Sequence, residues 1–364
     1  MQLQRLLLMS GLSLERKHSF FRQLTLFARF MERRGIETCL AGPLGKQHVH
    51  PHSHIKQDPE GVDLMNALIK KTGVQAAVLL GYADQFPFLQ RMSNSSFPVF
   101  LWAQVSNLID PSSLGNTLPV PLTVKTASLL EKSGIKRIGP VIPHGVDCTC
   151  FHPLSARERQ NARRMFGVKA RFVIGTVGAH TLRKRLDRII HAFSNFLQCD
   201  YDGALLIKTD RILSLEGNNL EALAKRLGVD HKVVFITRDL SDAEMNTLYN
   251  AMDLYLNLSE WEGFCIPVIE AMSCCIPVAA PPIQGPGEIL PFRELLIEWG
   301  SVEREGERSL FLANPQEAAE ILIKAFEHRA LLQQLGERGR REAEQRYDIR
   351  IVAQRWEELI SGVL

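Results

Sequence analysis

Short apolar segments and helical patterns alternate through the second half of this 364-residue chain. The apolar segments are near-continuous, as in the strands of a parallel sheet that is buried on both faces. They comprise residues 172–177, 204–208, 233–237, 254–258 and 277–280. Between the first two, apolar residues recur every three or four positions over residues 184–197, which predicts an amphipathic helix. Strands that alternate with helices in this way indicate a doubly wound α/β domain.

The first half of the chain repeats this rhythm less regularly. We expect strands at residues 6–9, 36–40, 76–80 and 97–103, and helices at residues 15–34, 62–71 and 123–131. Residues 143–153 contain two prolines and Gly145, which predicts a linker. The chain is therefore expected to form two domains, at residues 1–150 and 151–347.

The composition is that of a globular protein, with 45% hydrophobic and 23% charged residues. A net charge of +3 and the lack of a basic tail argue against a nucleic-acid partner. The longest apolar runs fall short of the roughly 18 residues that a membrane span needs. Residues 6–14 could pass for a weak signal peptide, but no small-residue cleavage site follows, which favours a buried strand. Seven cysteines without a C-x-x-C pair indicate a reduced, cytoplasmic chain.

The stretch from Ser259 to Ser273 carries the strongest chemical signal. It places Glu262 and Glu270 on either side of a turn that opens a helix, and Pro267 suits the first position of that helix. A helix N-terminus attracts phosphate through its unpaired N–H groups and its dipole. Two carboxylates beside phosphate would repel it unless they bind hydroxyl groups instead. A nucleotide-sugar, with sugar hydroxyls on both sides of a diphosphate, meets this demand.

The same stretch resembles the E-x7-E motif of the retaining glycosyltransferases of family 4, which have the GT-B fold. Three further segments are similar to segments of that family. They are Val141–Asp147 with Phe151–Pro153 (V-I-P-N-G-V-D…F-x-P), Gly175–Asp187 (G-x-V-G-R-x-x-x-x-K-G-x-D), and Glu270–Val278 with Gly285–Glu288 (E-A-M-A-x-G-x-P-V…G-x-x-E). The resemblance is strong over residues 120–364 and only architectural over residues 1–119.

This resemblance implies an α/β protein of two Rossmann-like, doubly wound domains that face a central cleft. The N-terminal domain would bind the acceptor and the C-terminal domain the nucleotide-sugar, with a final helix at residues 348–364 packing back on the first domain. The implied reaction moves a sugar from a nucleotide-diphosphate-sugar to a hydroxyl of a glycan, a lipid-linked sugar or a small molecule. It retains the anomeric configuration and uses neither a metal nor a cofactor.

The resemblance also implies roles for individual residues. Glu262 would hold a hydroxyl of the donor sugar, Lys184 would neutralise the leaving diphosphate, and Glu270 would bind the ribose. The other implied donor-binding residues are Gly178, Arg183, Phe264, Cys265, Ile266, Thr237 and Arg238. Two departures from the family stand out: Ala179 replaces an arginine, for which Arg183 or Arg185 would have to compensate, and Cys265 replaces a glycine.

Each of these residues also has a purely structural interpretation. Glu270 could simply complement the helix dipole, and Lys184 and Glu262 could be solvated surface residues. His180 and Glu288 could touch the ligand or serve only their loops, and the same holds for Gly285 and Gly287. The loop at Ser10 and Gly11 gives a weak signal. Two other functions therefore remain open, a non-catalytic protein that binds nucleotide-sugar or glycan, and a GT-B nucleotide-sugar epimerase.

Two patterns outside the motif suggest other contacts. His48, His50, His52 and His54 alternate as metal ligands on a strand would, but Pro51 favours a surface loop. The helix expected at residues 15–34 has an apolar stripe and a basic face, so it could touch an anionic bilayer at the inner membrane surface. Packing of that helix on its own sheet is the favoured alternative.

Overall fold

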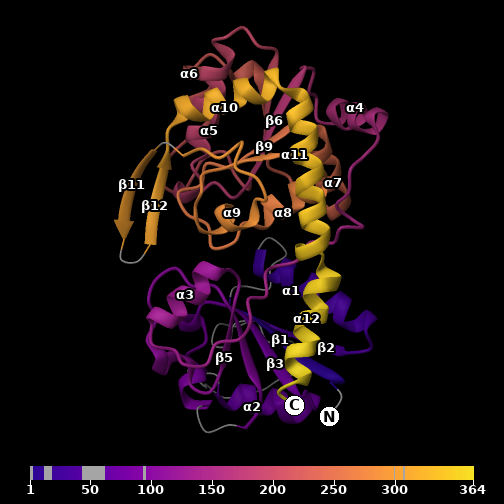
Figure 1. The fold of residues 1–364 in the computed structure, drawn as a ribbon, viewed down its shortest axis with the longest axis vertical. Coiled ribbons are helices and arrows are strands. Elements are labelled where there is room, and N and C mark those ends of the chain that lie inside the picture. Colours follow the sequence, from indigo (N-terminus) through magenta and orange to yellow (C-terminus); the bar gives the residue numbers. More distant parts are fainter. Residues whose placement is uncertain (1–2, 12–18, 43–61, 93–95, 299, 306–307) are drawn as a thin grey trace. The chain divides into compact units, whose positions relative to one another are not determined.

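The computed structural model describes residues 3–11, 19–42, 62–92, 96–298, 300–305 and 308–364. The chain forms two compact units (Figure 1). Unit 1 comprises Met1–Gly145 together with Asp348–Leu364, and unit 2 comprises Val146–Tyr347. The four histidines at positions 48, 50, 52 and 54 lie outside the described residues.

Unit 1 contains a parallel sheet with the strand order β2-β1-β3-β4-β5. Its strands are β1 (Arg5–Ser10), β2 (Glu37–Ala41), β3 (Ala76–Gly81), β4 (Val99–Ala103) and β5 (Leu118–Pro121). The four strands expected from the sequence are confirmed. The sequence did not predict β5, because two of its residues are prolines. Proline is tolerated there since β5 is an edge strand that pairs only with β4.

The helices of unit 1 enclose the sheet. They are α1 (Ser19–Arg33), α2 (Val62–Thr72), α3 (Val124–Lys132) and α12 (Ile349–Ser361), with short 3-10 segments η1 (Ala83–Gln85), η2 (Pro87–Met92) and η3 (Pro111–Leu114). The apolar stripe of α1, including Leu24, Phe27 and Met31, is buried within unit 1. The apolar face of α1, which would have to contact a bilayer in the membrane hypothesis, is therefore packed inside unit 1. Among the described helices, none is long and apolar enough to cross a membrane.

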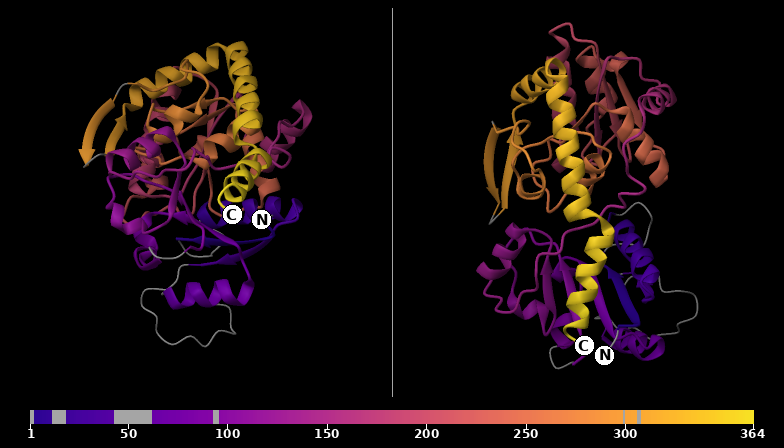
Figure 2. Two further views of the ribbon diagram at one scale, coloured as in Figure 1. Left: turned by 60° about the horizontal axis from the view of Figure 1, so that its bottom comes forward. Right: turned by 45° about the vertical axis from the view of Figure 1, so that its right-hand side comes forward.

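Helix α12 completes the core of unit 1 although it comes last in the chain. It packs against α1 (Figure 2), and its Trp356 is fully buried. The Trp356 ring lies 5.3 Å from that of Trp102 and 6.1 Å from those of Phe27 and Phe100, measured between ring centroids. Aromatic pairs at these separations stabilise a core beyond the area that they bury.

Unit 2 contains a second parallel sheet, with the strand order β10-β9-β6-β7-β8. Its strands are β6 (Phe172–Val177), β7 (Gly203–Lys208), β8 (Val233–Ile236), β9 (Leu254–Leu256) and β10 (Val278–Ala279). All five predicted strands are present, although β9 and β10 are shorter than expected. An antiparallel hairpin of β11 (Gly300–Glu305) and β12 (Arg308–Ala313) forms a separate sheet that the sequence did not predict.

Helices cover the sheet of unit 2. They are α4 (Ala156–Met165), α5 (Leu186–Leu197), α6 (Leu220–Arg226), α7 (Asp242–Ala251), α8 (Ile266–Ser273), α9 (Gln284–Ile289), α10 (Pro315–Glu327) and α11 (Arg329–Glu342), with 3-10 segments η4 (Leu182–Lys184) and η5 (Asp230–Lys232) and a π-helical segment η6 (Ala343–Tyr347). Helices α4 and α7 begin with Ser-x-x-Glu capping boxes, which satisfy N–H groups of the first turn.

Helix α8 ends in a Schellman motif. The Ile276 N–H donates to the Ala271 carbonyl and the Cys275 N–H to the Met272 carbonyl, both over 2.9 Å. Cys275 therefore occupies the left-handed position of the motif, with φ of 62°. A residue with a β-carbon is strained in this conformation, and glycine is not.

We expect Cys275→Gly to raise the free energy of unfolding by about 1 kcal/mol, because glycine relieves the left-handed strain. Urea unfolding of purified protein would measure the change. Cys275→Ala is the matched control, since it removes the thiol and keeps the β-carbon. If both variants changed stability equally, the thiol and not the backbone would be responsible.

Candidate functional site

Two loops of unit 2 meet at the carboxyl edge of its sheet. One loop follows β6 and carries Arg183, Lys184 and Arg185, and the other follows β9 and carries Glu260 and Glu262. Strands β6 and β9 are parallel neighbours, so both loops leave the sheet at the same end. Ligands of open α/β sheets bind outside this end of the strands.

Glu262 is the centre of the contacts between these loops. The residue is buried, at 5% exposure. Lys184 donates to Oε1 of Glu262, Arg183 lies 2.8 Å from Oε2, and the Ser259 hydroxyl donates to Oε1 over 2.9 Å. Burial alone disfavours the charged carboxylate, but Lys184 and Arg183 outweigh this effect and lower the pKa of Glu262 to about 2. Glu262 is therefore ionised at neutral pH.

The lowered pKa of Glu262 predicts a specific dependence of stability on pH. Because the folded-state pKa of about 2 lies below the ordinary 4.5, the ionised carboxylate stabilises the fold above pH 4.5, and this contribution is lost as the pH falls toward 2. We expect the stability advantage of the wild type over Glu262→Gln to shrink by about 2 kcal/mol between pH 6 and pH 3. Urea unfolding at both pH values would measure it. Glu320→Gln, at an exposed position of α10, should show no such change, and an equal change there would contradict the assignment.

Further contacts hold the two loops together. Arg185 Nε donates to Glu260 Oε1 over 2.6 Å, and the Glu260 N–H donates to the Arg183 carbonyl over 2.9 Å. The Arg183 guanidinium donates to the Trp261 carbonyl over 2.6 Å and lies 5.8 Å from the centroid of its ring. Arg183 is 38% exposed at its side chain, against 13% for Lys184. It therefore sits at the rim of the cluster, whereas Ala179, which replaces the family's arginine, has an exposed side chain and joins none of these contacts.

Gly178 begins the loop that ends at Lys184. Its N–H donates to the Lys208 carbonyl over 3.0 Å, and a β-carbon built on it would lie 3.3 Å from Lys184 Cδ. The aliphatic stem of Lys184 thus passes directly over Gly178. A larger residue would displace the lysine that contacts Glu262.

The turn between Glu262 and α8 contains Cys265 in a left-handed conformation and lies against Gly285. Cys265 precedes α8 with φ of 80°, a conformation that glycine adopts more readily. Its thiol accepts from Asn257 Nδ2 over 3.2 Å, and burial raises its pKa to about 12. Gly285 donates to the Glu262 carbonyl over 3.0 Å, and a β-carbon there would lie 2.1 Å from the Phe264 carbonyl oxygen. Gly287 similarly lies against Pro282, so both glycines have a structural role.

Glu270 is the fifth of the eight residues of α8 and is buried, at 5% exposure. The hydroxyl of Tyr249, on α7, donates to its Oε2 over 2.6 Å. Sequence reasoning missed Tyr249, which precedes Glu270 by 21 positions. The available signal was a tyrosine on the apolar side of a helix, because a buried tyrosine hydroxyl requires a hydrogen-bond partner.

The remaining predicted donor-binding residues fall into two groups, one just before and at the start of α8 and one after β8. Phe264 and Cys265 are buried and directly precede α8, which begins at Ile266. Thr237 and Arg238 are exposed and follow β8, which β7 separates from β6, and Arg238 pairs with Glu244 over 2.6 Å.

Two other residues of the sequence analysis have structural partners. His180 is buried, and its backbone N–H donates to Asp210 Oδ1 over 2.7 Å. In unit 1, a β-carbon on Gly11 would lie 2.1 Å from Gln85 Oε1, so this glycine permits a close approach of Gln85.

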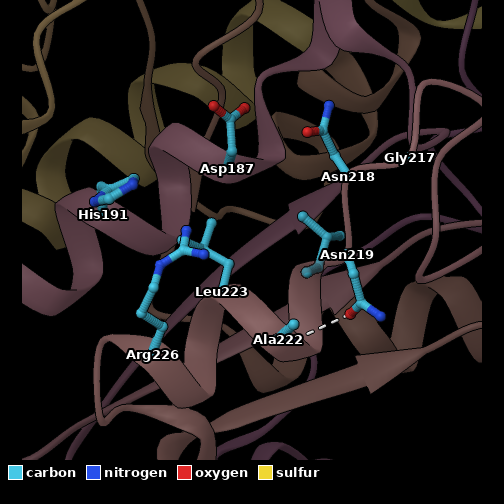
Figure 3. A pocket seen from close by; sticks show the side chains of 9 residues that line it. Asp187, His191, Gly217, Asn218, Asn219, Ala222, Leu223 and Arg226 are labelled. Carbon is cyan, nitrogen blue, oxygen red and sulfur yellow. Dashed lines mark hydrogen bonds between the residues drawn. The ribbon is translucent and has the colours of Figure 1, made fainter.

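A cavity of about 370 Å³ opens elsewhere in unit 2 (Figure 3). Asp187 and His191 line it from α5, and Asn219 and Arg226 from the beginning and end of α6. Asn219 caps α6 by accepting from the Ala222 N–H over 3.0 Å. None of the predicted site residues lines this cavity.

The fold and these segments define a family. The model for "Glycosyl transferases group 1" matches residues 158–342, and the chain belongs to this family. Over 255 residues, 68% of its length, the chain is 27% identical to mannosylfructose-phosphate synthase from Agrobacterium fabrum, of which the match covers 52%. The chain thus spans about half the length of the curated relatives that it matches.

Solved structures show the same fold over nearly the whole chain. Sucrose-phosphate synthase from Thermosynechococcus elongatus superposes with a TM-score of 0.78 at 15% identity, covering 99% of each chain. HepE from Anabaena, solved in complex with UDP-glucose, gives a TM-score of 0.71 at 16% identity and covers 98% of this chain and 99% of its own. The predicted fold class, GT-B with two Rossmann-like domains, is confirmed.

Proposed function

We propose that this protein is a glycosyltransferase that takes its sugar from a nucleotide-diphosphate-sugar. The observation that carries the proposal is the buried Glu262 held by Lys184 and Arg183 beside the start of α8. These cations and the helix N-terminus suit a diphosphate, and the carboxylates suit hydroxyl groups. HepE, which has the same fold, binds UDP-glucose, and this supports a donor of that class.

The charge state of Glu262 argues against this carboxylate as the general acid of a glycosidase. A glycosidase needs one of its two carboxyl groups protonated to act as a general acid, usually with a raised pKa. The pKa of Glu262 is lowered to about 2, so it cannot hold a proton at neutral pH. Following the resemblance to family 4, we assign Glu262 to binding of the donor sugar and Glu270 to binding of the ribose.

The proposed reaction retains the anomeric configuration, as in family 4. When the donor binds, Lys184 and Arg183 turn from Glu262 to the diphosphate, and Glu262 turns to a sugar hydroxyl. The bond between the anomeric carbon and the diphosphate oxygen then breaks. Lys184 and Arg183 stabilise the charge that develops on the leaving diphosphate, in place of a metal. The acceptor hydroxyl attacks from the same face and gives its proton to the leaving diphosphate oxygen. We propose that this hydroxyl belongs to a glycan, a lipid-linked sugar or a small molecule.

Ala179 favours a second candidate, a non-catalytic protein that binds the donor, because one cation of the family's segment is missing. The position of Arg183 counters this, since it supplies a second cation on Glu262. Donor consumption in the presence of acceptors distinguishes the two. A nucleotide-sugar epimerase would instead convert the donor without an acceptor and without a change of mass.

Thermal shifts with UDP, GDP, ADP, CMP and their sugar derivatives test the donor site. A ligand at 100 times its dissociation constant stabilises by about 2.7 kcal/mol, which corresponds to a rise in melting temperature of about 5–10 °C. We expect such a rise with one nucleotide, its loss in Glu270→Ala, and its retention in the exposed control Glu320→Ala. If none of the nucleotides or their sugar derivatives raised the melting temperature, the proposed function would be contradicted.

A further inference from the structure

The proposed function leaves one buried polar contact unexplained. Tyr249 is fully buried, and its hydroxyl donates to Glu270 Oε2 over 2.6 Å. Glu270 is also buried. A hydrogen bond to an ionised acceptor is stronger than one between neutral groups, so this contact strongly restricts the orientation of the carboxylate.

We propose that Tyr249 is a positioning residue that orients the Glu270 carboxylate toward the ribose hydroxyls of the donor. This inference rests on the proposed function, because it takes Glu270 as the ribose-binding residue. A carboxylate has about four acceptor sites on its two oxygens. The tyrosine occupies one of them and fixes the plane of the group, which determines where the other acceptor sites point.

Tyr249 is itself held in place by its surroundings. Its ring centroid lies 6.1 Å from those of Phe151 and Tyr255, and α7 packs against α8. Burial, followed by the charge of Glu270, raises the pKa of Tyr249 well above its ordinary value of 10. The hydroxyl therefore keeps its proton and remains a donor across the range of physiological pH.

Tyr255 offers a matched control. It is as fully buried as Tyr249 and lies on the neighbouring β9, but its hydroxyl donates to the Val177 carbonyl over 3.2 Å. A Tyr→Phe change at either position removes one buried hydroxyl and preserves the ring. Of the two hydroxyls, only that of Tyr249 donates a hydrogen bond to a carboxylate.

The experiment measures discrimination between ribose and deoxyribose. Affinities for UDP and GDP and for their 2′-deoxy and 3′-deoxy analogues are determined by calorimetry for the wild type, Tyr249→Phe, Tyr255→Phe and Glu270→Ala. A hydrogen bond to a charged acceptor corresponds to about ten- to one-hundred-fold in affinity, so the wild type should prefer the ribose form by about this factor. Tyr249→Phe should reduce the preference at least about fivefold, and Tyr255→Phe should retain it. For each variant, the affinities for the ribose and deoxyribose forms are measured on one preparation. A lower folded fraction affects both measurements alike and does not change their ratio.

The outcomes separate the inference from the proposed function. If Glu270→Ala loses the preference and Tyr249→Phe keeps it, the inference is wrong and the ribose site stands. An equal loss in Tyr249→Phe and Tyr255→Phe would also overturn the inference, because it would show a general effect of removing a buried hydroxyl. If Glu270→Ala keeps the preference, or the wild type binds no nucleotide, the ribose site fails and the inference fails with it.

A second measurement covers the case in which Tyr249→Phe does not fold. The chain has five tyrosines, and 3-fluorotyrosine labelling gives each a fluorine NMR signal. Single Tyr→Phe variants at the other four positions identify the Tyr249 signal by elimination. We expect this signal to shift with the nucleotide that binds and to shift less with its 2′-deoxy and 3′-deoxy analogues. Equal shifts with all three would overturn the inference.

Discussion

Replacing Lys184 by alanine is expected to lower the rate of donor consumption by about 10²- to 10³-fold. The Lys184 ammonium is mostly buried and contacts Glu262, and the proposed reaction assigns it to the leaving diphosphate. A charge placed to meet developing negative charge acts mainly in the transition state, and its loss lowers kcat more than it raises KM.

Steady-state kinetics with the donor identified by thermal shift would measure this effect. Lys225→Ala, at an exposed position of α6, is the control and should retain wild-type rates. Lys184→Arg keeps the charge and should recover part of the activity. A fall of less than about fivefold in Lys184→Ala would remove the lysine from the proposed reaction.

Replacing Trp356 by alanine is expected to lower the free energy of unfolding by about 3–5 kcal/mol. Trp356 is fully buried among Trp102, Phe27 and Phe100, and its removal would leave a cavity between α12 and the sheet of unit 1. Urea unfolding followed by circular dichroism would measure the loss. Arg355→Ala, on the exposed side of α12, should change stability by less than about 0.5 kcal/mol.

Trp356→Phe should destabilise much less than Trp356→Ala. Within the described residues, the buried Trp356 Nε1 has no hydrogen-bond partner. Phenylalanine removes this unsatisfied group, which offsets part of the lost packing. If Trp356→Ala cost less than about 1 kcal/mol, α12 would not be part of the core.

The sheets of both units could be predicted because their strands are continuous apolar segments. Among the strands, β5 and the β11–β12 hairpin escaped prediction. Strand β5 contains two prolines and β11 is mostly polar, so neither resembles a buried parallel strand. Spacing along the sequence also cannot show which distant residues meet. The contacts of Glu262 with Lys184 and of Glu270 with Tyr249 depend on the order of strands in the sheet and on the packing of helices.

The resemblance located the carboxylates and Lys184, but it did not show the backbone at the departures from the family. Four non-glycine residues have a positive φ in the described part of the chain, and Arg185, Cys265 and Cys275 are three of them. Each stands where the similar segments of the family have glycine. The left-handed backbone is therefore kept although its usual residue has changed, which indicates that tertiary contacts such as Arg185 with Glu260 impose it.

The division of unit 1 into two stretches of sequence has a consequence for the order of folding during synthesis. Unit 2 is continuous from Val146 to Tyr347, and these two residues are joined by a hydrogen bond of 2.8 Å between the Val146 N–H and the Tyr347 carbonyl. Domains usually fold in the order in which they leave the ribosome. Here the strands of unit 1 emerge first but lack Trp356 until unit 2 has been synthesised. Unit 1 therefore begins before unit 2 and is completed after it, and its incomplete core is exposed to chaperones and proteases throughout the synthesis of unit 2.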